Sequence, residues 1–141
     1  MKIIVKNEKE TISEGIKFSS LLTGGMILCL HGELGSGKTT FTKGLAKGLG
    51  INIEIKSPTF TLMNIYKISN KKIKTLIHID TYRLKNEHEL IEIGAEDYLG
   101  NPDTITIIEW PEKIKTLLIK KNVADIYFSH TANGFREITF N

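Results

Sequence analysis

Residues 32–39 read Gly-Glu-Leu-Gly-Ser-Gly-Lys-Thr, and this segment constrains the fold more than any other part of the chain. Its spacing is that of a P-loop, in which glycines let backbone N–H groups point inward at phosphate oxygens. Lys38 is predicted to reach the outer phosphates of a nucleotide, and the Thr39 hydroxyl is a candidate magnesium ligand. An apolar run at 26–30 precedes the loop and an amphipathic pattern follows it. A strand, this loop and a helix in succession predict a site for ATP with Mg²⁺.

The remaining pattern predicts a single α/β domain over residues 1–141. Strands are predicted at 2–5, 26–30, 59–68, 73–80, 104–109, 123–129 and 136–140, and helices at 11–22, from the P-loop to Gly50, at 87–93 and briefly from Pro111. Thr11 and Glu14 fit a capping box at the start of the first helix. The neighbouring runs 59–68 and 73–80 predict a β-hairpin, so the sheet is expected to be mixed. These elements predict a three-layer, P-loop NTPase-like domain with helices on both faces.

Composition limits the class of protein. With 40% hydrophobic and 25% charged residues, the chain resembles an ordinary globular domain. No apolar run approaches the roughly 18–20 residues that span a bilayer, so no membrane association is expected. The net charge of +3 comes with only two arginines, Arg83 and Arg136, and no basic stripe, which argues against direct nucleic-acid binding. The single Cys29 excludes an internal disulfide. We expect a cytoplasmic protein that is monomeric on its own.

Two acidic residues come directly after apolar runs that predict strands. Asp80 follows Leu-Ile-His-Ile, and Glu109 follows Ile-Thr-Ile-Ile. Because α/β sheets place their ligand crevice at the carboxyl ends of strands, both acids are candidate catalytic and magnesium-binding residues. Glu109 is assigned the metal or its water, and Asp80 a supporting or water-positioning role, a division that the sequence leaves open. The competing interpretation is a surface acid that happens to follow a strand. Neither Lys38 nor Glu109 is expected in the core.

Other candidate residues carry weaker signals. Residues 57–60, Ser-Pro-Thr-Phe, are either a phosphate-sensing loop or a turn that starts a strand. Arg83 is a candidate for neutralising transition-state charge, although a local salt bridge is favoured. Trp110 is more typical of a core or interface anchor than of a ligand-stacking group. The histidines show no metal-ligand spacing and are expected to be satisfied or exposed: His31, His78, His88 and His130.

Four segments, taken together, resemble the TsaE family, formerly called YjeE. They are Gly-Glu-Leu-Gly-Ser-Gly-Lys-Thr-Thr-Phe at 32–41, Ser-Pro-Thr-Phe at 57–60, His-Ile-Asp-Thr-Tyr-Arg-Leu at 78–84 and Glu-Trp-Pro-Glu at 109–112. Residues 90–99 also follow the family pattern, and the resemblance runs from about residue 11 to residue 136. The family consists of small bacterial ATPases of threonylcarbamoyladenosine tRNA modification. Four motifs in this order are a highly specific signal.

The resemblance implies a function beyond what the residues alone indicate. Such a protein binds ATP, hydrolyses it slowly and acts with the TsaD–TsaB heterodimer, which transfers threonylcarbamoyl to the adenosine beside the anticodon. It resets that complex and acts on tRNA indirectly, through the complex. Alone it is a weak magnesium-dependent ATPase, and its partners stimulate it. By motif, the nucleotide contacts are Thr11, Leu34, Gly35, Ser36, Gly37, Lys38, Thr39 and Thr40, with Thr39, Glu109 and Asp80 at the magnesium ion. Thr11 is placed near the base or sugar.

Two alternatives share the P-loop. A small-molecule kinase needs an acceptor pocket and a lid with several arginines, and two arginines in the chain argue against it. A GTP-driven switch needs an Asn-Lys-x-Asp guanine reader, and residues 70–73, Asn-Lys-Lys-Ile, lack the aspartate. A screen for phosphorylated acceptors tests the kinase, and nucleotide exchange with ATP and GTP tests the switch.

Overall fold

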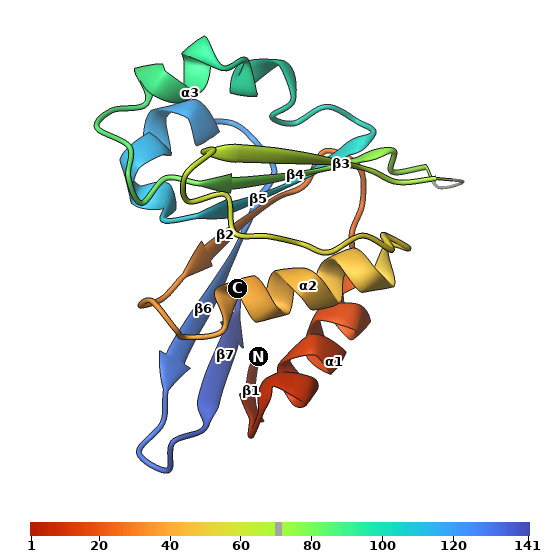
Figure 1. The fold of residues 1–141 in the computed structure, drawn as a ribbon, viewed down its shortest axis with the longest axis vertical. Helices are drawn as coiled ribbons and strands as arrows, with labels where there is room; N and C mark the ends of the chain where they lie inside the picture. The colour runs from red at the N-terminus through yellow and green to blue at the C-terminus, as the bar shows by residue number, and fades with distance from the viewer. Residues whose placement is uncertain (70–71) are drawn as a thin grey trace.

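A seven-stranded mixed sheet forms the centre of the computed structural model, which describes residues 1–69 and 72–141 (Figure 1). In chain order its strands are β1 (Lys2–Val5), β2 (Ile27–His31), β3 (Met63–Lys67), β4 (Thr75–Asp80), β5 (Thr104–Glu109), β6 (Val123–His130) and β7 (Arg136–Phe140). The order across the sheet is β1-β7-β6-β2-β5-β4-β3. The central pairs β6–β2, β2–β5 and β5–β4 are parallel, whereas β3–β4, β6–β7 and β1–β7 are antiparallel. The predicted mixed sheet with a β3–β4 hairpin is therefore confirmed.

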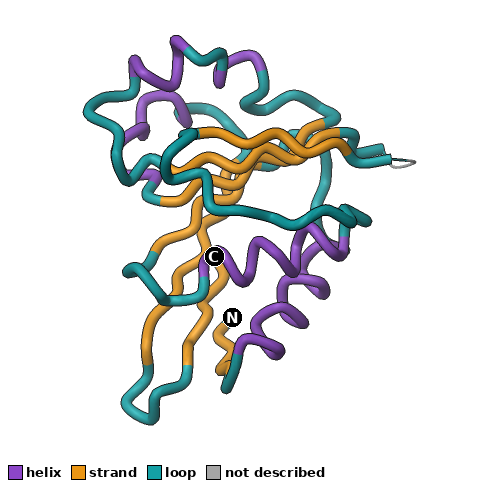
Figure 2. Tube along the Cα trace, viewed as in Figure 1, coloured by secondary structure: helices purple, strands orange, loops and turns teal. Residues whose placement is uncertain are grey.

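Helices cover both faces of the sheet, as predicted for a three-layer domain (Figure 2). The helices α1 (Glu8–Ser19) and α2 (Lys38–Gly48) lie on one face. The helix α3 (His88–Glu92) and the 3₁₀ segments η1 (Ala95–Asp97) and η2 (Pro111–Leu118) lie on the other. Successive side chains of a strand point to opposite faces of the sheet, so the sheet carries a hydrophobic core on both faces. Leu76 of β4 packs in the core on the α1 and α2 side, and its neighbour Ile77 packs in the core on the other side. No helix in the described part of the chain is long and apolar enough to cross a membrane.

The helix α1 starts earlier than predicted. Its N-cap is Asn7, whose side-chain oxygen accepts a hydrogen bond from the backbone N–H of Glu10 at 2.9 Å. The Glu10 carboxylate in turn accepts from the N–H of Lys6 at 2.7 Å. Thr11 is therefore not the cap: it is buried one turn inside the helix, where its hydroxyl donates to the Asn7 carbonyl. The periodicity concealed this start because residues 8–10 are all charged and exposed.

Several other elements differ from the expected ones, most clearly β3 and the segment that Pro111 opens. The strand β3 begins at Met63 because residues 59–62 form a turn, closed by a 2.7 Å hydrogen bond from the N–H of Leu62 to the Pro58 carbonyl. The segment that Pro111 opens is 3₁₀ and is interrupted at Ile114, where φ is −131°. The expected hairpin turn at 69–72, and the segment compared with a guanine reader, fall partly on residues 70–71, which lie outside the described residues.

The helices α1 and α2 pack backbone to backbone. A Cβ placed on Gly44 of α2 would lie 2.3 Å from the carbonyl oxygen of Ile12, and one on Gly15 of α1 would lie 2.5 Å from that of Phe41. Real Cβ atoms do not approach backbone this closely, so glycine is required at both positions. The close contact holds the start of α1 beside the loop that precedes α2.

A candidate nucleotide-binding site

The P-loop joins the carboxyl end of β2 to the start of α2. Within the loop, Gly37 is the N-cap of α2 and adopts φ 107°, a left-handed conformation that favours glycine. At Gly32, where φ is 153°, a Cβ would lie 2.7 Å from the carbonyl oxygen of Phe128. The first turn of α2 has no side-chain cap among the described contacts. Its backbone N–H groups, which have no partner within the helix, therefore remain available to an anion.

Lys38 is held across the loop rather than extended into solvent. Its Nζ donates to the Gly32 carbonyl at 2.6 Å and lies 3.9 Å from the centroid of the Trp110 ring. The residue is only 4% exposed, so the expectation that Lys38 lies outside the core is wrong. Burial lowers the pKa of the Lys38 ammonium, and the nearby carboxylates of Glu109 and Asp80 partly oppose that shift. A buried cation in this position is electrostatically prepared for a polyanionic ligand.

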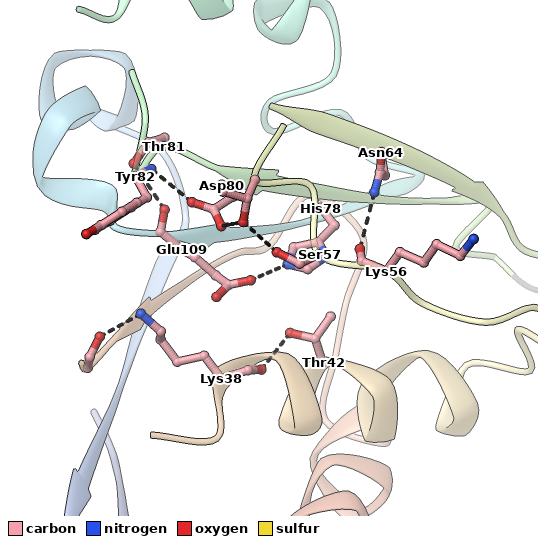
Figure 3. A network of polar contacts seen from close by, with 12 residues as sticks. Lys38, Thr42, Lys56, Ser57, Asn64, His78, Asp80, Thr81, Tyr82 and Glu109 are labelled. Carbon is pink, nitrogen blue, oxygen red and sulfur yellow. Dashed lines mark hydrogen bonds and ion pairs between the residues drawn. The ribbon is translucent and has the colours of Figure 1, made fainter. Parts of the chain in front are cut away.

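The two acids predicted at the strand ends are brought together. Asp80 and Glu109 are register partners on the adjacent strands β4 and β5, and each is 4% exposed. Glu109 was also expected outside the core, and that expectation is wrong. The residues that share their sides of the strands, Leu76 and Ile107, pack in the core beneath α1 and α2, so both acids face the P-loop side. Figure 3 shows Glu109 extending from the sheet toward α2, from which Lys38 extends.

Hydrogen bonds hold both carboxylates. Asp80 accepts from the backbone N–H of Tyr82 at one oxygen, at 2.8 Å, and from the hydroxyl of Thr59 at the other, at 3.0 Å. One oxygen of Glu109, Oε2, lies 2.7 Å from Nε2 of His78. Among the described contacts the other oxygen of Glu109, Oε1, has no hydrogen-bond partner. The two acids are therefore restrained differently, and Glu109 keeps one oxygen free.

A cleft of about 450 Å³ opens over the loop, a size suited to a cofactor. Most residues predicted from sequence line it: Thr11, Leu34, Gly35, Gly37, Lys38, Thr39, Thr40, Asp80 and Glu109. Ser36 does not line the cleft; it is buried within the loop, and its hydroxyl has no partner in the described structure. The sequence-based set is thus brought together around one cavity with this exception.

One wall of the cleft was not anticipated. It comprises Lys6, Asn7 and Glu8 at the start of α1 and Gly134 and Arg136 around the β6–β7 turn. These two segments meet because β1 pairs with β7, which places the entry to α1 beside that turn. No local signal marks them, because the pairing of the first and last strands is a long-range property of the sheet.

Residues 57–60 connect the cleft to the protein surface. The Ser57 hydroxyl lies 2.7 Å from that of Thr59, which donates to Asp80. Phe60 is 82% exposed, and the Arg83 guanidinium stacks over its ring at 4.5 Å from the centroid. Arg83 forms no ion pair with any residue that the structure describes, so the favoured local salt bridge is not formed. The segment is a turn that precedes β3, as one of the two interpretations held.

Two further side chains complete the site. Trp110 is only partly buried, adopts φ 61°, and packs against Tyr82 as well as Lys38, so it is not a core anchor. His78 is fully buried on the same side of β4 as Asp80, two residues away. The expectation that the histidines are satisfied or exposed fails for it, because its Nδ1 has no partner in the described structure. The sequence feature that could have placed His78 in the site is its position two residues before Asp80 on the same predicted strand.

The donor set fits magnesium bound together with a nucleotide. Across the described residues, no group of three or more His, Cys, Asp or Glu side chains is arranged to hold a metal ion. Magnesium is commonly bound by one or two carboxylates plus substrate phosphates, and does not require an all-protein cage. Glu109, Asp80 and the hydroxyl of Thr39 all line the same cleft and meet that requirement.

The sheet order, the glycine loop and the position of α2 define an α/β domain of the P-loop NTPase-like class. The family model described as threonylcarbamoyl adenosine biosynthesis protein TsaE matches residues 5–138. The chain belongs to this family.

Individual relatives support the assignment. The tRNA threonylcarbamoyladenosine biosynthesis protein TsaE of Treponema pallidum is 38% identical over 139 residues, covering 99% of this chain and 98% of that protein. Its counterpart in Bacillus subtilis is 36% identical over 134 residues, covering 95% of this chain and 80% of that protein. The crystal structure of Bacillus subtilis YdiB superimposes with a TM-score of 0.76 at 31% identity, covering 99% of this chain and 83% of that one. The predicted fold and family are thereby confirmed.

Proposed function

We propose that this protein binds ATP with Mg²⁺ and hydrolyses it slowly as part of threonylcarbamoyladenosine modification of tRNA, acting with a TsaD–TsaB complex. The proposal for the tRNA pathway draws on the family and on the function for which its relatives are named. The chemical proposal rests on one observation: the P-loop lysine and two strand-end carboxylates meet at a single cleft. That combination is the minimum a P-loop ATPase requires.

The loop and α2 act as the phosphate-binding part of the site. Backbone N–H groups at the start of α2 and the Lys38 ammonium neutralise the outer phosphates, where charge accumulates during transfer. Thr11, with Arg136 and the other residues at the start of α1 and the β6–β7 turn, lines the same cleft and faces the base and sugar. Bound magnesium would supply further charge neutralisation to the outer phosphates.

Hydrogen bonding supports a division of labour between the two acids. Both oxygens of Asp80 already accept hydrogen bonds, from the 57–60 loop and from the Tyr82 backbone. Glu109 has one oxygen held and one without a partner in the described structure. Glu109 is therefore the better direct ligand, together with Thr39, for the metal or its water, and Asp80 supports the loop that faces the outer phosphate.

The placement of the two arginines supports the proposal of slow hydrolysis. Stabilising the transition state of phosphoryl transfer with an arginine is worth about 10³–10⁵ in rate. Here the Arg83 guanidinium stacks on Phe60, and Arg136, which lines the cleft, donates to the Gly134 carbonyl in the β6–β7 turn. Neither arginine is engaged at the phosphate-binding loop, so a partner residue or a rearrangement is needed for rapid turnover.

The test is ATP turnover by the purified chain, alone and with the TsaD–TsaB pair. The control is Glu109→Gln, which keeps the volume of a buried side chain and removes its charge. Strong stimulation by the pair, lost in the variant, is the expected result. ATP binding without stimulation would contradict the partner role, and a phosphorylated small-molecule acceptor would favour a kinase instead.

A further inference from the structure

We propose that His78 is the positioning residue that sets the orientation of the Glu109 carboxylate for the magnesium–nucleotide complex. The inference rests on the proposed function and deepens it, because it assigns a task to a buried side chain that the P-loop mechanism does not use. It is carried by a single contact, the 2.7 Å separation between His78 Nε2 and Glu109 Oε2, and by the surroundings of both groups.

The direction of the hydrogen bond is determined by chemistry. A carboxylate only accepts hydrogen bonds, so the hydrogen is on Nε2 and His78 donates it to Oε2. That bond occupies one oxygen of Glu109, a residue that lines the cleft, and among the described contacts leaves Oε1 without a partner. The backbone of Glu109 is held as well, because its carbonyl accepts from both the N–H and the hydroxyl of Thr81, at 3.1 and 3.0 Å. The side chain is thus held at its oxygen and at its backbone.

Packing alone does not account for a histidine at this position. His78 is 0% exposed, its chain neighbours Ile77 and Ile79 are core residues, and its register partners are Ile107 on β5 and Asn64 on β3. Its Nδ1 has no partner among the described residues, and a buried polar atom without a partner destabilises a fold. A leucine would fill a similar volume without that cost. The bond to Glu109 is what the imidazole adds.

The bond also keeps Glu109 apart from Lys38. The ammonium of Lys38 is buried and feels the charge of Glu109, yet within the described structure the two form no ion pair. Lys38 instead donates to the Gly32 carbonyl, while Glu109 is held by His78 on the sheet side (Figure 3). An unrestrained carboxylate would be drawn to the lysine, which would remove both groups from the ligand. Restraint by His78 leaves the lysine for phosphate and the acid for metal.

The experiment measures magnesium affinity separately from turnover. A fluorescent N-methylanthraniloyl-ATP is bound to the protein and titrated with Mg²⁺, and steady-state hydrolysis is measured in parallel. His78→Leu removes the donor, His78→Gln places an amide N–H near the position of Nε2, and His78→Asn keeps a polar amide that is too short to reach it. Glu109→Gln marks the full loss of the carboxylate.

We expect His78→Leu to weaken magnesium binding and to lower kcat by about 10–100-fold, the usual effect of removing a partner that orients a metal ligand. Nucleotide affinity without magnesium should stay close to wild type. KM for ATP in the presence of magnesium should rise as the magnesium affinity falls, because one thermodynamic cycle links the two. His78→Gln should restore most of the loss, and His78→Asn should not. If His78→Leu does not fold, the magnesium affinities of His78→Gln and His78→Asn, compared with each other, test the assignment.

Two results would overturn the assignment. One is a folded His78→Leu with wild-type magnesium affinity, and the other is equal behaviour of the Gln and Asn variants. A wild-type protein without magnesium-dependent nucleotide binding would instead overturn the proposed function, and the assignment with it. The two failures are therefore distinguishable in the same titration.

Discussion

The ammonium of Lys38 lies 3.9 Å from the centre of the Trp110 ring, on the side of the sheet that carries the P-loop. Trp110 follows Glu109 directly, in a left-handed conformation that bulky residues rarely adopt. The strand end that supplies an acid to the site thus also supplies an aromatic face to its lysine. A cation held over a tryptophan ring is stabilised by about 0.5–2 kcal/mol, more where water is excluded.

The first prediction concerns this contact. Trp110→Leu should weaken nucleotide binding by about 2–30-fold, the range that corresponds to the loss of one cation–π contact. Trp110→Phe, which keeps an aromatic face, should lose less. Because Trp110 is the only tryptophan, its fluorescence should also change when nucleotide binds. Isothermal titration of the three proteins with an ATP analogue checks the order, and equal affinities would contradict it.

Removing the P-loop cation should separate activity from folding. Lys38→Met keeps the length of the buried side chain and removes its charge, so hydrolysis should fall by at least about 10²-fold, as when a transition-state donor is lost. The thermal midpoint should stay within a few degrees of wild type, because burial of the ammonium is itself unfavourable. Circular dichroism melting and ATP turnover test both parts. A variant that unfolds would indicate that Lys38 is needed for structure.

The close contact between α1 and α2 should not tolerate a methyl group at Gly44. In an exposed helix, Gly→Ala stabilises by about 1 kcal/mol. At Gly44 the added Cβ would lie 2.3 Å from the Ile12 carbonyl, so Gly44→Ala should instead lower the free energy of unfolding by about 1–3 kcal/mol. Lys43→Ala, one residue away and exposed, is the matched control and should change it by less than about 0.5 kcal/mol. Urea denaturation compares them.

Cys29 should make the fold sensitive to alkaline pH. Burial, with smaller contributions from the charges of Asp125 and Glu112, raises the pKa of its thiol from 9.0 to about 12. The folded state therefore keeps the proton that the unfolded state releases. This contribution to stability is complete below pH 9.0 and is lost as the pH rises toward 12, by up to about 1.4 kcal/mol per pH unit.

Unfolding of wild type and Cys29→Ala at several pH values between 8 and 11 tests this. Near neutral pH, replacing the thiol should lower the free energy of unfolding by an amount that does not depend on pH, because a small cavity forms. Above pH 9, the free energy of unfolding should fall less steeply with pH in the variant than in wild type. The native thiol should also resist alkylation at pH 8 until the protein is unfolded. Parallel pH profiles for the two proteins would show that Cys29 does not titrate in this range.

Much of the fold was predictable because it is encoded locally. The strand at residues 104–109 was predicted with its observed bounds, since a continuous apolar run between turn residues has few other conformations. Prediction failed where local signals competed: Asn7 caps α1 rather than Thr11, because the first turn carries charged residues that hide the helical period. The start of β3 was predicted too early, because the turn before it contains three residues that favour strands, Thr59, Phe60 and Thr61.

For the site, the P-loop, its lysine and the acids at two strand ends could be predicted from the chain alone. These follow from residue type and spacing along one segment, because a glycine loop before a helix can be read without knowing its neighbours. The tertiary structure decided which groups meet across the sheet. The bond of His78 to Glu109, the contact of Lys38 with Trp110, and Arg136 at the cleft wall all depend on strand register and order. Register is set by how the whole sheet buries its two faces, and no single segment contains that information.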